Sequence, residues 1–168
     1  MIDIYEQQDN NGREIFKSFC KVKHWCKHHK DATEQYSHWD TSYYSGKTMV
    51  VAEIKERNYD SSAFSDWYGE IYKYNQLMLI KDKYKAKGMD VKIHYINLFN
   101  DNQVIIWDLD LISPESFEMN LPKHTLEDNG NVNKKMYRLW KAQSILWEKI
   151  IDYAEPYGDE DDEDDLGF

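Results

Sequence analysis

The spacing of hydrophobic residues predicts three helices. Helical periodicity runs through residues 13–30, where apolar side chains fall at steps of three or four. A longer stripe predicts a second helix over 64–87, which Gly88 would end. A third helix is expected over 140–153, whereas residues 1–11 are polar and expected to be loose. The stripes consist of Ile15, Phe19, Val22 and Cys26 in the first helix, and Phe64, Trp67, Ile71, Tyr74 and Met78 in the second.

Short apolar runs between these helices predict strands. Residues 36–44 and 48–55 are separated by the turn signal Ser45-Gly46-Lys47, so we expect a hairpin. Two further strands are predicted at 91–98 and 103–109. A variable segment follows, interrupted by Pro122 and Asp128-Asn129-Gly130, with short strands expected around 116–121 and 135–139.

The order of these elements predicts an α/β fold with a central mixed β-sheet flanked by helices. The chain has 168 residues, which suits one domain. We expect that domain to span residues 12–153, after a flexible N-terminus of residues 1–11. Residues 154–168 are expected to form a disordered acidic tail.

The charge of the chain is concentrated at its C-terminal end. Net charge is -10, but eight acids lie within residues 155–165, and without them 21 basic and 23 acidic residues remain. The body is therefore nearly neutral, so a nucleic-acid partner is not excluded. Basic clusters at 13–30, 81–87 and 134–138 could contact phosphates, although solvated helix faces often look the same.

Composition argues against a membrane or disulfide-stabilised protein. No window approaches about 18 continuous apolar residues, and the N-terminus lacks the basic-then-apolar order of a signal peptide. Two cysteines, Cys20 and Cys26, suit a reducing cytoplasm. With nearby histidines they could suggest zinc, but a structural zinc site usually draws four ligands from more than one element. A basic helix with incidental His24, His28 and His29 is the simpler interpretation.

The segment from Asp40 to Lys55 carries the most specific chemistry. Strand side chains alternate between faces, so Glu53 and Lys55 point the same way, with Ile54 behind them. The hairpin can bring Asp40 beside them. Two carboxylates crowded against an ammonium suit a hard cation, because Mg²⁺ prefers oxygen ligands. A surface hairpin with a cross-strand ion pair is the alternative.

This pattern, an Asp on one hairpin strand and Glu-x-Lys on the next, resembles the PD-(D/E)XK nucleases. The resemblance covers roughly residues 13–110 and implies a restriction-endonuclease-like core. It implies that Asp40 and Glu53 bind Mg²⁺ or Mn²⁺ with the Ile54 carbonyl, that Glu34 assists, and that Lys55 positions the attacking water. It also implies a nucleic-acid substrate, DNA by family precedent, and leaves a homodimer open.

The chain departs from the family pattern in two places. Trp39, not Pro, precedes Asp40. Some exonuclease branches carry Gln-x-x-x-Tyr on the second helix, whereas this chain has the reverse order, Tyr72 and Gln76. Tyr72, Lys73 and Gln76 are therefore weaker candidates for nucleic-acid contacts, with an exposed helix face as the alternative.

Two other functions stay open at this point. The fold could be kept for binding nucleic acid or protein with weak catalysis or none. It could also serve a structural or interaction role in a phage or mobile element, since the richness in Asn, Lys, Ile and Tyr is typical of an AT-rich genome. A phage or bacterial nuclease acting in the cytoplasm of the cell or infected host is the favoured interpretation.

Overall fold

The computed structural model describes residues 4–23, 27–32, 38–124 and 127–149. Two α-helices, nine strands and two short 3-10 helices make up this part of the chain. In chain order they are α1 (Ile4–Lys23), β1 (Lys27–Asp31), β2 (Thr41–Ser45), β3 (Thr48–Arg57), β4 (Asp66–Glu70), α2 (Ile71–Lys85), β5 (Val91–Phe99), β6 (Gln103–Asp108), η1 (Leu109–Leu111), β7 (Phe117–His124), β8 (Glu127–Trp140), η2 (Lys141–Gln143) and β9 (Leu146–Lys149).

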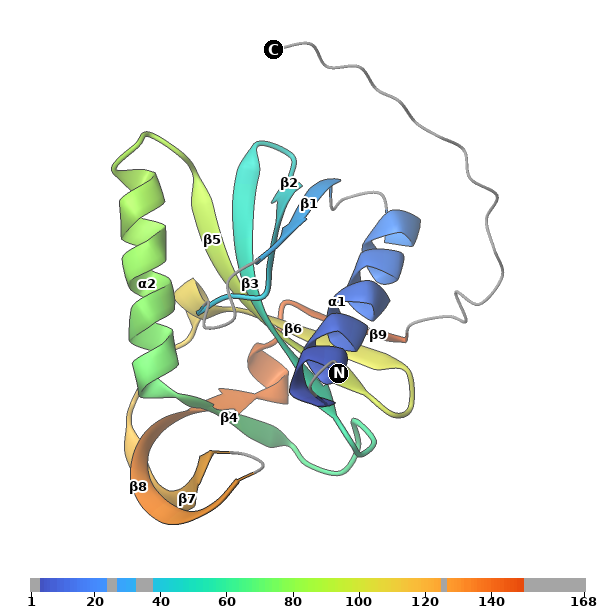
Figure 1. Cartoon of the computed structure of the whole chain (residues 1–168). Coiled ribbons are helices and arrows are strands. Elements are labelled where there is room, and N and C mark those ends of the chain that lie inside the picture. The colour runs from blue at the N-terminus through green and yellow to red at the C-terminus, as the bar shows by residue number, and fades with distance from the viewer. Residues whose placement is uncertain (1–3, 24–26, 33–37, 125–126, 150–168) are drawn as a thin grey trace.

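A six-stranded mixed sheet forms the centre, in the order β1-β2-β3-β5-β6-β9. The pair β3–β5 is parallel and the other pairs are antiparallel. A parallel pair needs a crossover, which β4 and α2 supply. Figure 1 shows α1 and α2 on either side of this sheet. The predicted class, a central mixed sheet flanked by helices, is confirmed.

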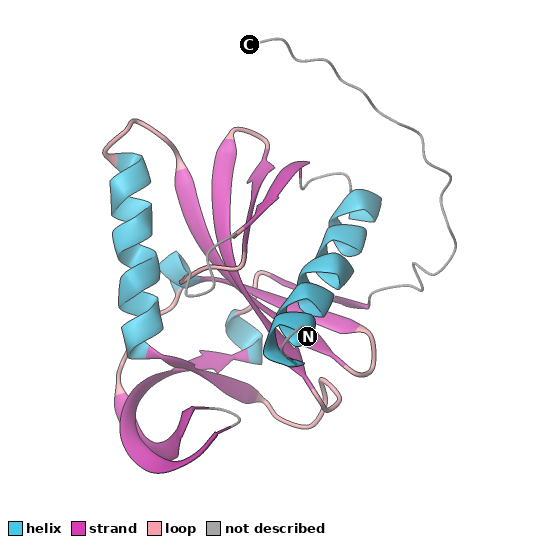
Figure 2. Cartoon of the chain, in the orientation of Figure 1, coloured by secondary structure: helices cyan, strands magenta, loops and turns pink. Residues whose placement is uncertain are grey.

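The two faces of the sheet bury separate apolar clusters, because neighbouring residues of β3 point to opposite faces. Val50, Ala52 and Ile54 pack with Phe16 and Phe19 of α1. On the other face Val51 lies in a cluster with side chains of α2, β5, β6 and β8, among them Leu77, Ile93, Trp107 and Leu139. Figure 2 shows these layers as helix, sheet and helix.

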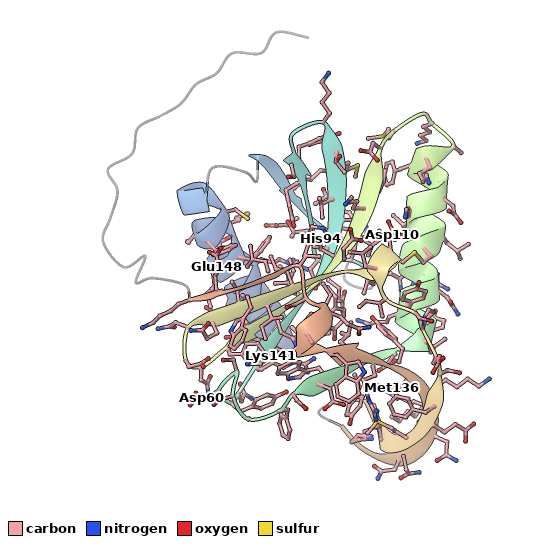
Figure 3. The ribbon with its side chains drawn as sticks, turned by 180° about the vertical axis from the view of Figure 1, so that it is seen from behind. Asp60, His94, Asp110, Met136, Lys141 and Glu148 are labelled. Carbon is pink, nitrogen blue, oxygen red and sulfur yellow. The ribbon has the colours of Figure 1, made fainter. Side chains whose placement is uncertain are left out.

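A smaller antiparallel sheet, in the order β4-β8-β7, lies at the bottom of Figure 1, and its strands β4 and β8 contribute residues to the second cluster. Its strand β8 is strongly bent in Figure 1, and Met136 and Lys141 of this region are labelled in Figure 3. Pro122 is tolerated because β7 is an edge strand, where no ladder partner needs its missing N–H. The short strands expected near 116–121 and 135–139 are confirmed and are longer than expected.

The first predicted helix is right for residues 13–23 and wrong at both ends. α1 begins at Ile4, so most of the segment expected to be loose is helical. Residues 27–31 form β1, which pairs with β2 at the edge of the sheet. Residues 24–26 lie outside the described part, and the polar sequence of β1 carries no strand pattern that could have identified it. The strand predicted at 36–44 is found at Thr41–Ser45, with residues 33–37 outside the described part.

Two further helix predictions need correction. Residues 66–70 of the second helix form β4, although Ile71–Lys85 are helical as expected. Trp67 is buried in the cluster on the second face of the sheet, and a helix would have buried it as well. The apolar stripe therefore could not distinguish a strand from a helix at these residues. The third predicted helix, 140–153, is a 3-10 turn followed by β9 up to Lys149. Its later residues, and the acidic tail, lie outside the described residues.

Strands predicted at 48–55, 91–98 and 103–109 are confirmed as β3, β5 and β6. The turn between β2 and β3 is also confirmed, with Gly46 at φ 61°. Among the described helices, none has the length and apolar character needed to span a membrane. The domain limits proposed from the sequence stay a prediction.

Candidate active site

Asp40 lies in the bend that precedes β2, one residue before Thr41, so it is not on the strand where the sequence prediction placed it. Its backbone N–H donates to the carbonyl of Ala52 at 2.9 Å. Its side chain is 16% exposed, and Oδ2 accepts a hydrogen bond from the Ile54 N–H at 2.6 Å. Arg13 of α1 lies 3.5 Å from the other oxygen, Oδ1. Asp40 is therefore fixed beside Ala52 and Ile54 of β3, the two neighbours of Glu53, as the sequence predicts.

Glu53 is a buried carboxylate on β3 that receives two cations at one oxygen. Its Oε1 lies 2.6 Å from Nζ of Lys55, two residues further on the same face. Nζ of Lys73, on α2, lies 2.8 Å from the same oxygen. The Glu53 side chain is 2% exposed, whereas both lysines are partly exposed. The helix that crosses over between β3 and β5 thus adds a second ammonium to the Glu-x-Lys pair.

The two carboxylates repel one another. Burial, followed by the negative charge of Glu53, raises the pKa of Asp40 to about 6. Burial alone would raise the pKa of Glu53, but Lys55 and Lys73 hold it below its ordinary value. Burial would lower the pKa of Lys55, yet the charge of Glu53, with Tyr95 and Asp40, raises it. Glu53 is thus ionised and Lys55 protonated near neutral pH. The negative charge of Asp40 is the one that burial and the neighbouring Glu53 destabilise.

The backbone of β3 adds an oxygen to this site. β2 has its last pair with β3 at Thr41 and Ala52, so the edge of β3 beyond Ala52 faces the Asp40 side chain. Successive residues of a strand direct their N–H and C=O groups to alternate edges. The Ile54 carbonyl consequently leaves β3 on the edge where its N–H meets Asp40. The role of this carbonyl as a metal ligand, which the sequence resemblance implies, stays a prediction.

Comparisons with family profiles and with curated proteins find no match. A comparison with solved structures finds similarity to Hjc, a Holliday junction resolvase from the archaeal hyperthermophile Archaeoglobus fulgidus. The TM-score is 0.49 and the sequence identity 10%, over 83% of this chain and 92% of that chain.

The weaker candidates on α2 differ in whether their side chains reach the site. Lys73 reaches Glu53, so the structure brings it into the site. Tyr72 is 61% exposed, and its ring lies 5.9 Å from that of His38, two residues before Asp40. Gln76 is half-buried on the same helix, and among the described residues it makes no hydrogen bond to the site. Glu34 lies outside the described residues, so its role stays a prediction.

No group of three or more metal-binding side chains gathers among the described residues, but His24 and Cys26 lie outside them, so the zinc alternative is not tested. Cys20 is buried in the α1 cluster, as a core residue. Two of the basic side chains that could contact phosphates are paired with acids. Lys134 lies 3.1 Å from Glu70, and Arg138 lies 2.9 Å from Asp66.

Sequence reasoning missed three residues around the site. Arg57 continues the face of Glu53 and Lys55 at the same spacing of two, so strand alternation could have identified it. Tyr95 and Asn97 pair with Glu53 and Lys55 across the parallel ladder, which only the register reveals.

A pocket of about 440 Å³ lies elsewhere, around Phe117, Arg138 and Trp140 of the small sheet. The Arg138 guanidinium lies 5.0 to 5.6 Å from the centres of the Tyr68, Phe117 and Trp140 rings. This pocket contains none of the predicted site residues.

Proposed function

We propose that this chain is a metal-dependent nuclease of the PD-(D/E)XK type, hydrolysing phosphodiester bonds in DNA. The observation that carries the proposal is the buried carboxylate of Glu53, which holds Lys55 and Lys73 on one oxygen with Asp40 close by. Burial of a carboxylate pair is costly unless a cation or hydrogen bonds compensate. A structural role alone would not require the repulsion between Asp40 and Glu53.

The donor set fits Mg²⁺ or Mn²⁺. Asp40 and Glu53 would supply carboxylate oxygens and Ile54 its carbonyl, all hard ligands. Within the described residues, Glu53 Oε2 accepts no hydrogen bond or ion pair, since both lysines lie on Oε1. Glu34 is proposed as a further ligand from the resemblance. A cation bound there supplies Lewis-acid polarisation of a phosphoryl oxygen.

Lys55 acts as a fixed positive charge in this proposal. Its raised pKa keeps it protonated, so it orients the attacking water and stabilises negative charge at the phosphate rather than accepting a proton. Lys73 holds Oε1 of Glu53 from the opposite side. The two lysines thereby fix the carboxylate, leaving the edge near Asp40 for the cation.

The wider setting also belongs to the proposal. The proposed place of action is the cytoplasm of a bacterium or of a phage-infected host. The two cysteines support a reducing compartment, and the richness in Asn, Lys, Ile and Tyr supports a phage or bacterial origin. A homodimer would place two such sites on two strands, and sedimentation of the full chain tests it.

The test is cleavage of end-labelled single- and double-stranded DNA and RNA with Mg²⁺, Mn²⁺ or EDTA. Asp40→Asn and Lys55→Ala are compared with wild type, and Lys47→Ala serves as control because Lys47 is an exposed lysine in the turn at the other end of β3. Metal-dependent cleavage lost in the two site variants and kept in the control supports the proposal. Absence of cleavage of every substrate by wild type would instead favour a binding or structural protein with this fold.

A further inference from the structure

Arg57 extends the candidate active site along β3. It is the last residue of the strand and follows Glu53 and Lys55 at intervals of two, so all three side chains leave the same face. Two residues of a strand span roughly 6–7 Å. The row therefore places a guanidinium one step beyond the Lys55 ammonium, at the end of β3 opposite the β2–β3 turn.

Two buried neighbours on β5 hold this guanidinium. Arg57 Nε donates to Oδ1 of Asn97 at 3.2 Å, and Nη2 donates to the hydroxyl of Tyr95 at 3.3 Å. Both acceptors are uncharged, and both residues are buried. Within the part of the chain that the structure describes, no carboxylate pairs with Arg57. Its orientation is thus fixed while its positive charge stays unneutralised.

Asn97 has a further property that a purely structural role does not explain. It is fully buried, and its Nδ2 has no hydrogen-bond partner among the described residues. A buried amide N–H without a partner destabilises the folded state. The Asn97 oxygen accepts the hydrogen bond from Arg57 while its Nδ2 stays unpaired. This arrangement does not favour the stability of the strands alone.

The guanidinium has five N–H donors, and the two described hydrogen bonds use two of them. A partly exposed arginine with free donors and a fixed plane matches the oxygens of a phosphate, which it can bind with two parallel hydrogen bonds. Lys55 and Lys73 add positive charge on the same side. Among the described residues of the site, these three cations face two carboxylates, Glu53 and Asp40, so one positive charge is left over.

We infer that Arg57 forms a second phosphate site, which binds the backbone phosphate adjacent to the one at the candidate active site. Tyr95 and Asn97 are its positioning residues. The inference rests on the proposed function, because it takes a nucleic-acid strand to be the ligand. Its consequence is that one strand runs along the end of β3, passing Lys55 and then Arg57.

Binding in EDTA tests this site without any cleavage. Anisotropy of a fluorescein-labelled DNA duplex, and of its single strand, is measured with the full chain at several salt concentrations. Arg57→Gln should weaken duplex binding roughly tenfold at low salt. The slope of log affinity against log salt should fall by about 0.9 for the duplex and about 0.7 for the single strand, the change for one lost phosphate contact.

Three further variants separate the inference from loss of fold. Lys47→Gln removes one positive charge from the opposite end of the hairpin and should leave the slope unchanged. Arg57→Lys should restore the slope, since it keeps the charge, but not the full affinity. Tyr95→Phe keeps the Arg57 charge and should weaken binding a few-fold with an unchanged slope. Circular dichroism melting confirms that each variant is folded.

A slope in Arg57→Gln equal to that of wild type would overturn the inference, as would a wild-type chain that binds neither DNA. An Arg57-dependent slope in a protein that never cleaves would contradict the proposed catalysis and leave the phosphate site standing. The two failures are thereby distinguishable.

Discussion

Lys73 Nζ lies 2.8 Å from Glu53 Oε1, the same oxygen that Lys55 Nζ approaches at 2.6 Å. One lysine comes from the strand that carries Glu53 and the other from the crossover helix. Because both charges act on one buried carboxylate, removal of either lysine leaves Glu53 paired, whereas removal of Glu53 leaves two ammonium groups facing each other. The predictions below use this asymmetry.

The two lysines should differ in their effect on catalysis. Lys55→Ala should lower kcat about 100-fold or more, because it removes the charge proposed to act on the water and phosphate. Lys73→Ala should lower it roughly 5- to 20-fold, because Lys73 only holds Glu53 in place. Lys47→Ala, at an exposed lysine in the β2–β3 turn, is the control and should match wild type. Single-turnover cleavage in Mg²⁺ measures all three, and equal losses in Lys55→Ala and Lys73→Ala would contradict the division of roles.

Replacing Glu53 should destabilise the metal-free protein. Glu53→Gln leaves Lys55 and Lys73 without their shared counter-ion, and we expect a loss of about 1–3 kcal/mol in unfolding free energy, because both ammonium groups keep partial access to water. Urea denaturation in EDTA measures this loss. The double variant Glu53→Gln/Lys73→Met should recover part of it, and a double variant no more stable than the single one would argue against the charge explanation.

Stability in EDTA should also depend on pH through Asp40. Burial and Glu53 raise the pKa of Asp40 to about 6 from 3.8, so the folded chain binds more protons than the unfolded chain between these values. The contribution of Asp40 to the unfolding free energy therefore falls as pH rises from about 4 to about 6, by on the order of 2–3 kcal/mol.

Asp40→Asn isolates this effect. His94 acts in the opposite direction, because burial lowers its pKa to about 4, so its contribution to stability rises with pH between about 4 and 6.5. The difference between wild type and Asp40→Asn cancels His94 and should decline across pH 4 to 6. Added Mg²⁺ should reverse the decline for wild type alone. A difference independent of pH would show that Asp40 titrates normally.

Gly69 is required where β4 passes the ring of Tyr137. A Cβ at Gly69 would overlap the end of that ring, so Gly69→Ala should cost roughly 1–3 kcal/mol in unfolding free energy. In a Tyr137→Leu background the same substitution should cost under about 0.5 kcal/mol, because the ring is gone. Thermal or urea unfolding of the four proteins of this cycle provides the measurement. Equal costs in both backgrounds would mean that the overlap is relieved elsewhere.

The sequence was sufficient for β3, β5 and β6 of the central sheet because these strands are largely buried and apolar, whereas β1 and β9 of the same sheet were predicted as parts of helices. Residues 48–55, 91–98 and 103–109 are short runs bounded by turns, and the structure confirms each. β4 was missed because Trp67, Ile71 and Tyr74 continue one helical stripe, although a strand supplies the first of them. Gly69 inside the predicted helix was the available signal against it.

The candidate site was predictable where its residues share one strand. Glu53 and Lys55 follow from alternation along β3, and the short turn at Gly46 brings Asp40 back to them. Lys73, Tyr95 and Asn97 could not be identified in this way, because their places depend on the crossover and on the register of β5. Local pattern specifies a strand face, whereas contacts between elements depend on packing.

The connection of β4 to α2 determines when the site can be completed during synthesis. Asp40, Glu53, Lys55 and Lys73 all lie in the first half of the chain, and β4 ends at Glu70 where α2 begins. β4, however, takes its sheet partner from β8, and Tyr137 of that strand packs on Gly69 and Tyr74. A nascent chain released up to β6 therefore has its acids and lysines but lacks the strand that seats the start of α2. We therefore expect complete assembly of the site only after β8 has left the ribosome.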